Sequence, residues 1–214
     1  MIISRGRRYI FVHIPKTGGT AMALALEDRA KADDILIGDT PKAQRRRKRL
    51  KALTARGRLW KHAMLADIDG VVGPEELNDF LIFTLVRNPW DRVVSYYHWL
   101  RTQSFDHPAV TLAQSLSFAD FLRAEHVQAS LQHSPAARYV TDAQGREREA
   151  LFLRLEHLEA DKAPLEAHLG FQLEMPHANR SDRTADYRAY YDDAGAAIIA
   201  RVCAADIARF GYSF

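Results

Sequence analysis

Two glycines, a lysine and two threonines follow an apolar run near the start of the chain. The segment His13–Thr20 reads HIPKTGGT, and the run Tyr9–Ile14 has the β-branched and aromatic residues typical of a buried strand. The backbone N–H groups of a glycine turn, with the positive end of the next helix, can bind a phosphate or sulfate. Lys16 adds a mobile positive charge, and Thr20 is expected to cap the following helix. The pattern predicts an anion-binding loop; the simpler interpretation is a strand-to-helix turn with an exposed lysine.

The order of residues in this loop differs from that of a Walker A loop. In a Walker A loop the lysine follows the glycines, and the next Ser or Thr hydroxyl binds Mg²⁺. In His13–Thr20 the lysine precedes the glycines, so its charge is expected at the start of the loop. This difference disfavours a small-molecule kinase of the P-loop class, which stays as an alternative.

A second candidate anion site follows the apolar run Phe80–Val86. Arg87 comes directly after it, at a strand end where ligands gather in open α/β sheets. The guanidinium fork of Arg87 suits a phosphate, and Ser95, about two helical turns further on, could add a hydroxyl bond. The structural alternative is that Arg87 and Arg92 pair with Asp91 or other carboxylates.

Together the two segments resemble the donor-binding motifs of the carbohydrate-type sulfotransferases, which depend on 3′-phosphoadenosine 5′-phosphosulfate (PAPS). His13–Thr20 is similar to the 5′-phosphosulfate loop of that family, and Leu85–Tyr97, LVRNPWDRVVSYY, resembles its 3′-phosphate motif RNPxxRxxSxY. The resemblance implies transfer of a sulfuryl group from PAPS to a hydroxyl of a carbohydrate or similar acceptor. The donor contacts that it implies are Lys16, Thr17, Gly18, Gly19, Thr20, Ala21, Arg87 and Ser95.

Late segments resemble the same family more loosely. Leu153–Leu158 is similar to its late strand with an R-x-E-x-L signature. Asn179–Ser181 and Phe210–Tyr212 resemble its C-terminal pattern, in which a basic residue closes over the donor. The resemblance therefore adds Arg180 and Ser181 as donor contacts.

Sulfuryl transfer depends on positioning, on charge stabilisation and on a group that accepts the acceptor's proton. Lys16 is the candidate for stabilising the leaving 5′-phosphate oxygen, and no carboxylate cluster in the sequence indicates a metal site. A histidine has a suitable pKa for the base. The chain has nine histidines. His62 falls between the two donor motifs, where members of the sulfotransferase family that these motifs resemble often have their catalytic histidine. Glu156 and His98 are the alternative bases, and a merely exposed or capping His62 stays open.

Length and composition indicate one ordinary soluble domain over residues 1–214, with 47% hydrophobic and 27% charged residues. The single cysteine, Cys203, excludes an intramolecular disulfide. No apolar run approaches the roughly 20 residues of a membrane helix, and the N-terminus lacks the apolar stretch of a signal peptide. A cytoplasmic location is therefore expected.

The net charge of +3 is unevenly distributed along the chain. Residues 42–61 contain ten Lys and Arg and no Asp or Glu, which leaves 20 basic and 27 acidic residues elsewhere. We expect the basic segment 41–61 to form a helical insertion or loop. It could attract an acidic acceptor or a membrane surface, although a solvated helical face is the simplest interpretation. No recognised nucleic-acid module accompanies it, so no nucleic-acid partner is expected.

Strands and helices alternate along the sequence. Strands are expected at Tyr9–Ile14, Phe80–Val86 and Ala150–Leu155, with helices after each and a closing C-terminal helix that ends near Phe210. The alternation predicts an α/β fold with a P-loop-NTPase-like central parallel sheet flanked by helices. A non-catalytic nucleotide-binding module that keeps this frame is a further alternative to the enzyme.

Overall fold

The computed structural model describes residues 1–176, 184 and 186–214 of the chain. Two predicted donor contacts, Arg180 and Ser181, lie outside these described residues. The chain forms two compact units: unit 1 comprises Met1–Val86 and Ala136–Asn179, and unit 2 comprises Arg87–Pro135 and Arg180–Phe214. Each unit has a hydrophobic core of its own, and the single domain over residues 1–214 stays a prediction.

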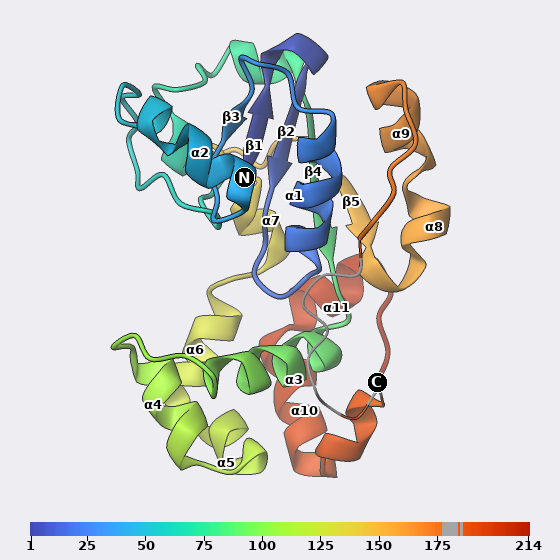
Figure 1. Cartoon of the computed structure of the whole chain (residues 1–214). Helices are drawn as coiled ribbons and strands as arrows, with labels where there is room; N and C mark the ends of the chain where they lie inside the picture. Colours follow the sequence, from blue (N-terminus) through green and yellow to red (C-terminus); the bar gives the residue numbers. More distant parts are fainter. Residues whose placement is uncertain (177–183, 185) are drawn as a thin grey trace. The chain divides into compact units, whose positions relative to one another are not determined.

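Unit 1 is built on a five-stranded sheet of order β3-β1-β2-β4-β5 (Figure 1). Its strands are β1 (Ile2–Ser4), β2 (Tyr9–Val12), β3 (Ile35–Leu36), β4 (Leu81–Val86) and β5 (Leu151–Arg154). β2, β4 and β5 run parallel, whereas β1 is antiparallel to both β2 and β3. The α/β class is confirmed, and the sheet is mixed rather than wholly parallel. Only four residues separate β1 from β2, too few for the crossover that parallel neighbours need.

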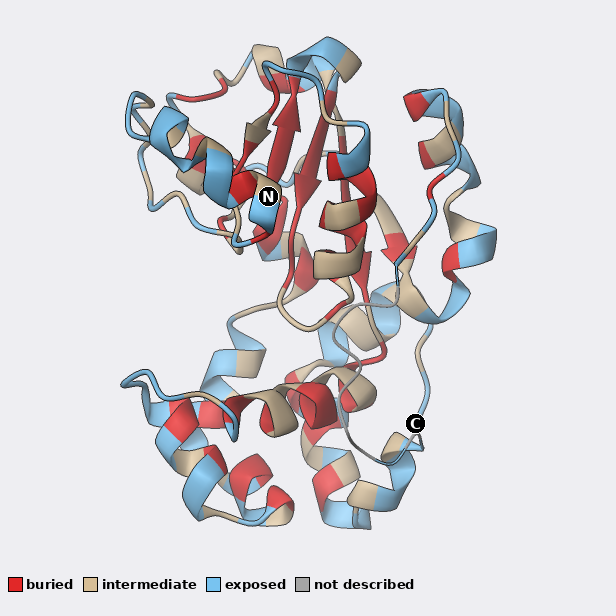
Figure 2. Cartoon of the chain, viewed as in Figure 1, coloured by how far each residue is buried: buried red, intermediate tan, exposed pale blue. Residues whose placement is uncertain are grey.

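The helices of unit 1 follow these strands. They are α1 (Gly19–Asp28), α2 (Pro41–Leu50), α7 (Ala136–Tyr139), α8 (Leu158–Asp161) and α9 (Ala163–Leu169), with 3-10 helices η1 (Arg5–Arg7), η2 (Leu65–Ile68), η3 (Glu76–Asp79) and η4 (Leu155–His157). α2 occupies only the first half of the basic segment. Thr40 caps it by accepting a hydrogen bond from Ala43 N at 3.2 Å. Ala43 is its one buried residue, so α2 is mostly exposed (Figure 2).

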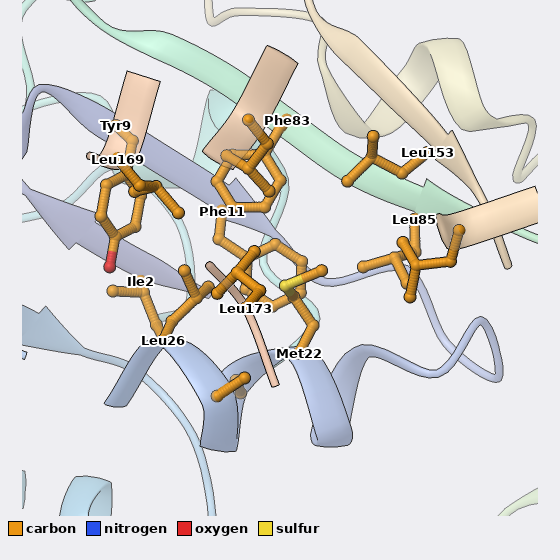
Figure 3. Close-up of a cluster of buried hydrophobic side chains, with 14 of the residues drawn as sticks. Ile2, Tyr9, Phe11, Met22, Leu26, Phe83, Leu85, Leu153, Leu169 and Leu173 are labelled. Carbon is orange, nitrogen blue, oxygen red and sulfur yellow. The ribbon is translucent and has the colours of Figure 1, made fainter. Parts of the chain in front are cut away.

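The core of unit 1 lies between one face of the sheet and the helices that cover it (Figure 3). Alternate strand residues point to this face, and the rings of Phe11 and Phe83 stack with their centroids 5.2 Å apart. Met22 and Leu26 of α1 are buried in the same cluster. The apolar face of α1 is therefore packed against the sheet, and this packing holds the loop between β2 and α1 at both ends.

Unit 2 is helical. Its elements are α3 (Pro89–Leu100), α4 (Pro108–Ser115), α5 (Phe118–Arg123), α6 (Glu125–Gln132), η5 (Tyr187–Tyr190), α10 (Asp193–Val202) and α11 (Ala204–Phe210). Asn88 caps α3 by accepting a hydrogen bond from Trp90 N at 3.1 Å, and Pro89 is the first helical residue, as its sequence predicts. The predicted closing helix is two helices, because the chain leaves helical geometry at Cys203.

None of the helices in the described part of the chain is long and apolar enough to cross a membrane.

Candidate functional site: the glycine loop and His62

The loop between β2 and α1 has a tightly determined backbone. Lys16 and Gly18 both have positive φ, 65° and 86°. The Thr17 side chain is buried, and its hydroxyl donates a hydrogen bond to Ile14 O at 2.9 Å, which closes the turn. Gly18 is the N-cap of α1, so Thr20 lies in the first turn of the helix and does not cap it. The predicted cap is wrong because the left-handed glycine ends the loop two residues earlier.

Each glycine of the loop is in contact with a side chain of unit 1. A Cβ on Gly18 would lie 2.8 Å from Leu155 Cδ1, and one on Gly19 would lie 2.1 Å from His13 Cδ2. Real Cβ atoms essentially never approach so closely. Gly18 also needs its positive φ, which a side chain disfavours. Gly18 thus requires glycine for its backbone conformation and Gly19 requires it for packing, and the sequence pattern alone did not show these two neighbours.

His13 forms the wall of the loop. Its side chain is buried, and its ring stacks on Phe11 with centroids 5.8 Å apart. Burial lowers the pKa of His13 well below its ordinary value, and the nearby His62 acts in the same direction. The ring is therefore neutral at neutral pH, which suits a packing role.

The structure brings His62 next to His13. The two rings meet edge to face with centroids 4.6 Å apart. His62 Nδ1 lies 2.8 Å from the backbone oxygen of His13. Because a carbonyl oxygen can only accept, Nδ1 carries the proton and Nε2 carries the lone pair when the ring is neutral. Burial lowers the pKa of His62 to about 4, and Lys61 adds to the effect, whereas the bond to the His13 carbonyl opposes it. His62 is thus neutral at pH 7, with a fixed tautomer.

A small pocket adjoins these residues on the side of α1 that faces Ile37–Thr40. His13, Thr20, Glu27 and Lys61 are among the residues that line it. The Thr40 hydroxyl contacts both carboxylate oxygens of Glu27 at 2.7 Å, and burial raises the pKa of Glu27. The pocket therefore has polar and charged side chains in its wall, and it runs along α1, the helix that follows the glycine loop.

The two alternative bases have different surroundings. Glu156 is an exposed residue of η4 in unit 1. His98 belongs to α3 in unit 2, where its ring meets those of Tyr97 and Tyr190 at 5.5 and 5.1 Å. His98 is therefore a member of an aromatic cluster. His62 contacts the glycine loop through the backbone oxygen of His13.

The second candidate anion motif follows β4 without a spacer. Arg87 Nε and a terminal nitrogen lie 2.8 and 2.6 Å from Asp91 Oδ2, and 14% of the arginine side chain is exposed. The ion pair that the structural alternative predicted is therefore present. It fixes the guanidinium, which has further N–H donors beyond the two that Asp91 accepts. Ser95, one turn beyond Asp91 on α3, is buried.

In the segment Leu153–Leu158, Arg154 of β5 forms an ion pair. Arg154 Nε and a terminal nitrogen donate to the two carboxylate oxygens of Asp161, each at 2.8 Å. This bidentate pair is the first cause of the lowered pKa of Asp161, about 2. Arg154 thus has a structural role, which holds α8 against the end of β5. Among the described residues no group of three or more His, Cys, Asp or Glu side chains could hold a metal ion.

Both motifs lie within a part of the chain that matches a known protein family. A model of the sulfotransferase family matches residues 1–139, more than half of the chain. The chain belongs to the sulfotransferase family. The match confirms the sequence prediction of a PAPS-dependent sulfotransferase, with PAPS as its co-substrate. Among solved structures, mouse sulfotransferase SULT7A1 complexed with PAP is similar over 94% of this chain and 84% of that chain, with 17% identity and a TM-score of 0.46. A search of curated proteins found no match.

Proposed function

We propose that this sulfotransferase moves the sulfuryl group of PAPS to a hydroxyl of a carbohydrate or similar acceptor by in-line displacement, with His62 as the base. The observation that carries the proposal is the contact chain from His62 to the glycine loop. His62 Nδ1 donates to the His13 carbonyl, and the His13 ring packs on Gly19 at the start of α1. A neutral imidazole with a fixed tautomer thus lies in contact with a loop of the type that binds anions.

PAPS has two charged ends, and each motif would bind one of them. The 5′-phosphosulfate would take the loop residues Lys16, Thr17, Gly18 and Gly19, with Thr20 and Ala21 in the first turn of α1. The Thr17 hydroxyl donates within the loop, so its part in binding would come from the backbone. The 3′-phosphate would take Arg87 and Ser95, and Arg180 and Ser181 stay proposed donor contacts from the family resemblance.

The reaction step needs one proton acceptor and one charge stabiliser. The acceptor oxygen forms a bond to sulfur while the bond between sulfur and the 5′-phosphate oxygen breaks. Nε2 of His62 takes the hydroxyl proton and later releases it to solvent. Lys16 stabilises the oxygen that leaves, whose charge grows in the transition state. The products are the sulfated acceptor and 3′,5′-ADP.

Thermal-shift titration separates this function from the kinase alternative. We expect 3′,5′-ADP to stabilise the protein in the presence of EDTA, and ATP with Mg²⁺ to stabilise it less. Stabilisation only by ATP with Mg²⁺ would contradict the proposal. Turnover of PAPS with a panel of hydroxyl acceptors then separates an enzyme from a nucleotide-binding module, which would bind 3′,5′-ADP and transfer nothing.

A further inference from the structure

The segment that leads into His62 presents a large aromatic side chain to solvent. Trp60 is 43% exposed, one of three large hydrophobic side chains exposed in the described part of the chain. Its ring lies edge to face with that of His62, with centroids 5.1 Å apart. Trp90, in contrast, is buried in the core of unit 2. An indole that is half in solvent and directly beside the candidate base is placed for contact with a ligand.

An arginine accompanies this indole. The guanidinium carbon of Arg58 lies 5.6 Å from the ring centroid of Trp60. Arg58 is exposed, and among the described residues it pairs with no carboxylate. Arg58, Trp60 and His62 occupy alternate positions in the sequence, and successive contacts join them. The row therefore offers a cation, an apolar ring and a proton acceptor in order.

The backbone that carries this row is held at several points. Arg56 N donates to Asp69 O at 2.8 Å, and Gly57 N donates to Asp67 O at 2.9 Å. Further along, Ala63 N donates to Trp60 O at 2.9 Å. The amino group of Met1 donates to Lys61 O, also at 2.9 Å. The row is thus preorganised, which lowers the entropy lost when a ligand binds.

The charge around the row indicates the sign of that ligand. Of the ten cations in residues 42–61, only Lys61 pairs with a carboxylate in the part of the chain that the structure describes, at 2.6 Å from Asp39. Lys42, Arg46 and Arg49 donate hydrogen bonds to backbone carbonyls, which carry no full negative charge. The segment is therefore positive and attracts an anion.

We infer that Arg58 and Trp60 are acceptor-positioning residues, and that the acceptor is a saccharide that carries a negative charge. The apolar C–H face of a sugar ring packs on the indole, and a carboxylate or sulfate of the sugar accepts hydrogen bonds from Arg58. The 5.1 Å between the Trp60 and His62 rings lets a sugar packed on the indole bring a hydroxyl to Nε2. This inference rests on the proposed role of His62.

Kinetics with three acceptors test the inference at saturating PAPS. The acceptors are a chondroitin hexasaccharide with uronate groups, neutral chitohexaose and the aromatic 2-naphthol. We expect Trp60→Ala to raise the KM for chondroitin at least about tenfold and Trp60→Phe to restore most of the loss. Arg58→Ala should raise the KM for chondroitin and leave that for chitohexaose unchanged. The Kd for 3′,5′-ADP, measured by calorimetry, should be unchanged in all three variants.

Two matched substitutions serve as controls, and both should leave the KM for each acceptor unchanged. Phe105→Ala truncates another exposed aromatic side chain, which is 47% exposed. Arg101→Ala removes another exposed arginine, whose guanidinium carbon lies 5.6 Å from the ring centroid of Tyr97. An unchanged chondroitin KM in Trp60→Ala, or an equal change in the controls, would overturn the inference. So would a preference for 2-naphthol.

The binding of chondroitin gives an outcome that does not depend on turnover. Calorimetry on the protein loaded with 3′,5′-ADP should detect binding of chondroitin hexasaccharide, and Trp60→Ala should raise the Kd of this binding. If the wild type binds 3′,5′-ADP and does not bind chondroitin, the inference fails and the proposed donor function stands. If the wild type binds no 3′,5′-ADP, the proposed function itself fails.

Discussion

The imidazole of His62 has a pKa suited to remaining neutral rather than to binding protons strongly. Burial lowers this pKa to about 4. If His62 is the base, kcat/KM should rise with pH through an apparent pKa near 4 and be flat from about pH 5.5 to 8, because the free enzyme is already deprotonated there. A pH–rate profile checks this, and in His62→Ala the activity should fall sharply and the remaining activity should no longer rise with pH near 4. A limb centred near the ordinary histidine value would show that another group is the base.

Lys16 should contribute more to the chemical step than to donor binding. Its charge meets an oxygen whose negative charge grows in the transition state. Lys16→Ala should therefore lower kcat by about 10²-fold or more, with a smaller change in the Kd for 3′,5′-ADP. Steady-state kinetics and calorimetry on the same preparation measure both quantities. Lys16→Arg, which keeps a positive charge, is the control, and an intact kcat in Lys16→Ala would assign Lys16 to binding alone.

Arg87 should supply a charge-assisted contact to the 3′-phosphate even though Asp91 already holds it. Arg87→Ala should weaken the binding of 3′,5′-ADP by about 1.5–3 kcal/mol, which corresponds to a rise in Kd of roughly tenfold to hundredfold. Arg101→Ala, at the end of the same helix, should leave the affinity unchanged. Equal affinities for the wild type and a folded Arg87→Ala variant would leave Arg87 with only its ion pair to Asp91.

At the scale of elements, the turn from β2 into α1 depends on the absence of a side chain at Gly19. A Cβ there would lie 2.1 to 2.8 Å from three atoms of the His13 ring, which is buried and cannot swing into solvent. Gly19→Ala should therefore lower the free energy of unfolding by about 1–3 kcal/mol. It should also weaken the binding of 3′,5′-ADP, because the loop shifts. Gly73→Ala is the matched control, because nothing lies within 4 Å of its Cβ. Denaturant unfolding and calorimetry measure the two effects.

The main elements of the donor loops could be predicted from sequence because each signal is local. Apolar runs place β2, β4 and β5 within two residues of their observed ends, and Asn88 with Pro89 starts α3. β1 cannot be predicted in this way, because three residues give too short a pattern. The contacts of His13 with Gly19 and of His62 with His13 join residues that are distant in sequence, so no local pattern shows them. Only the motif context suggested His62.

At the scale of the whole molecule, buried neutral histidines make folding depend on pH. The pKa of His62 is about 4 in the folded state against 6.5 for the free side chain. Below pH 6.5 the unfolded chain therefore binds a proton that the folded protein does not, and stability falls as the pH drops from 6.5 to 4. The loss should approach roughly 3 kcal/mol at pH 4, at about 1.4 kcal/mol per pKa unit. Urea unfolding at several pH values measures it. His62→Gln should flatten the dependence, and an unchanged slope would contradict the buried neutral state.

The contact between the His13 ring and Gly19 also has a consequence for how such sequences diverge. A residue larger than glycine at position 19 fits only if position 13 becomes smaller, so the two positions are expected to change together. A double-mutant cycle makes the same point in one protein: His13→Ala should recover part of the stability that Gly19→Ala loses. Positions 13 and 19 therefore form one evolutionary unit, whose members lie on opposite sides of the lysine of the loop.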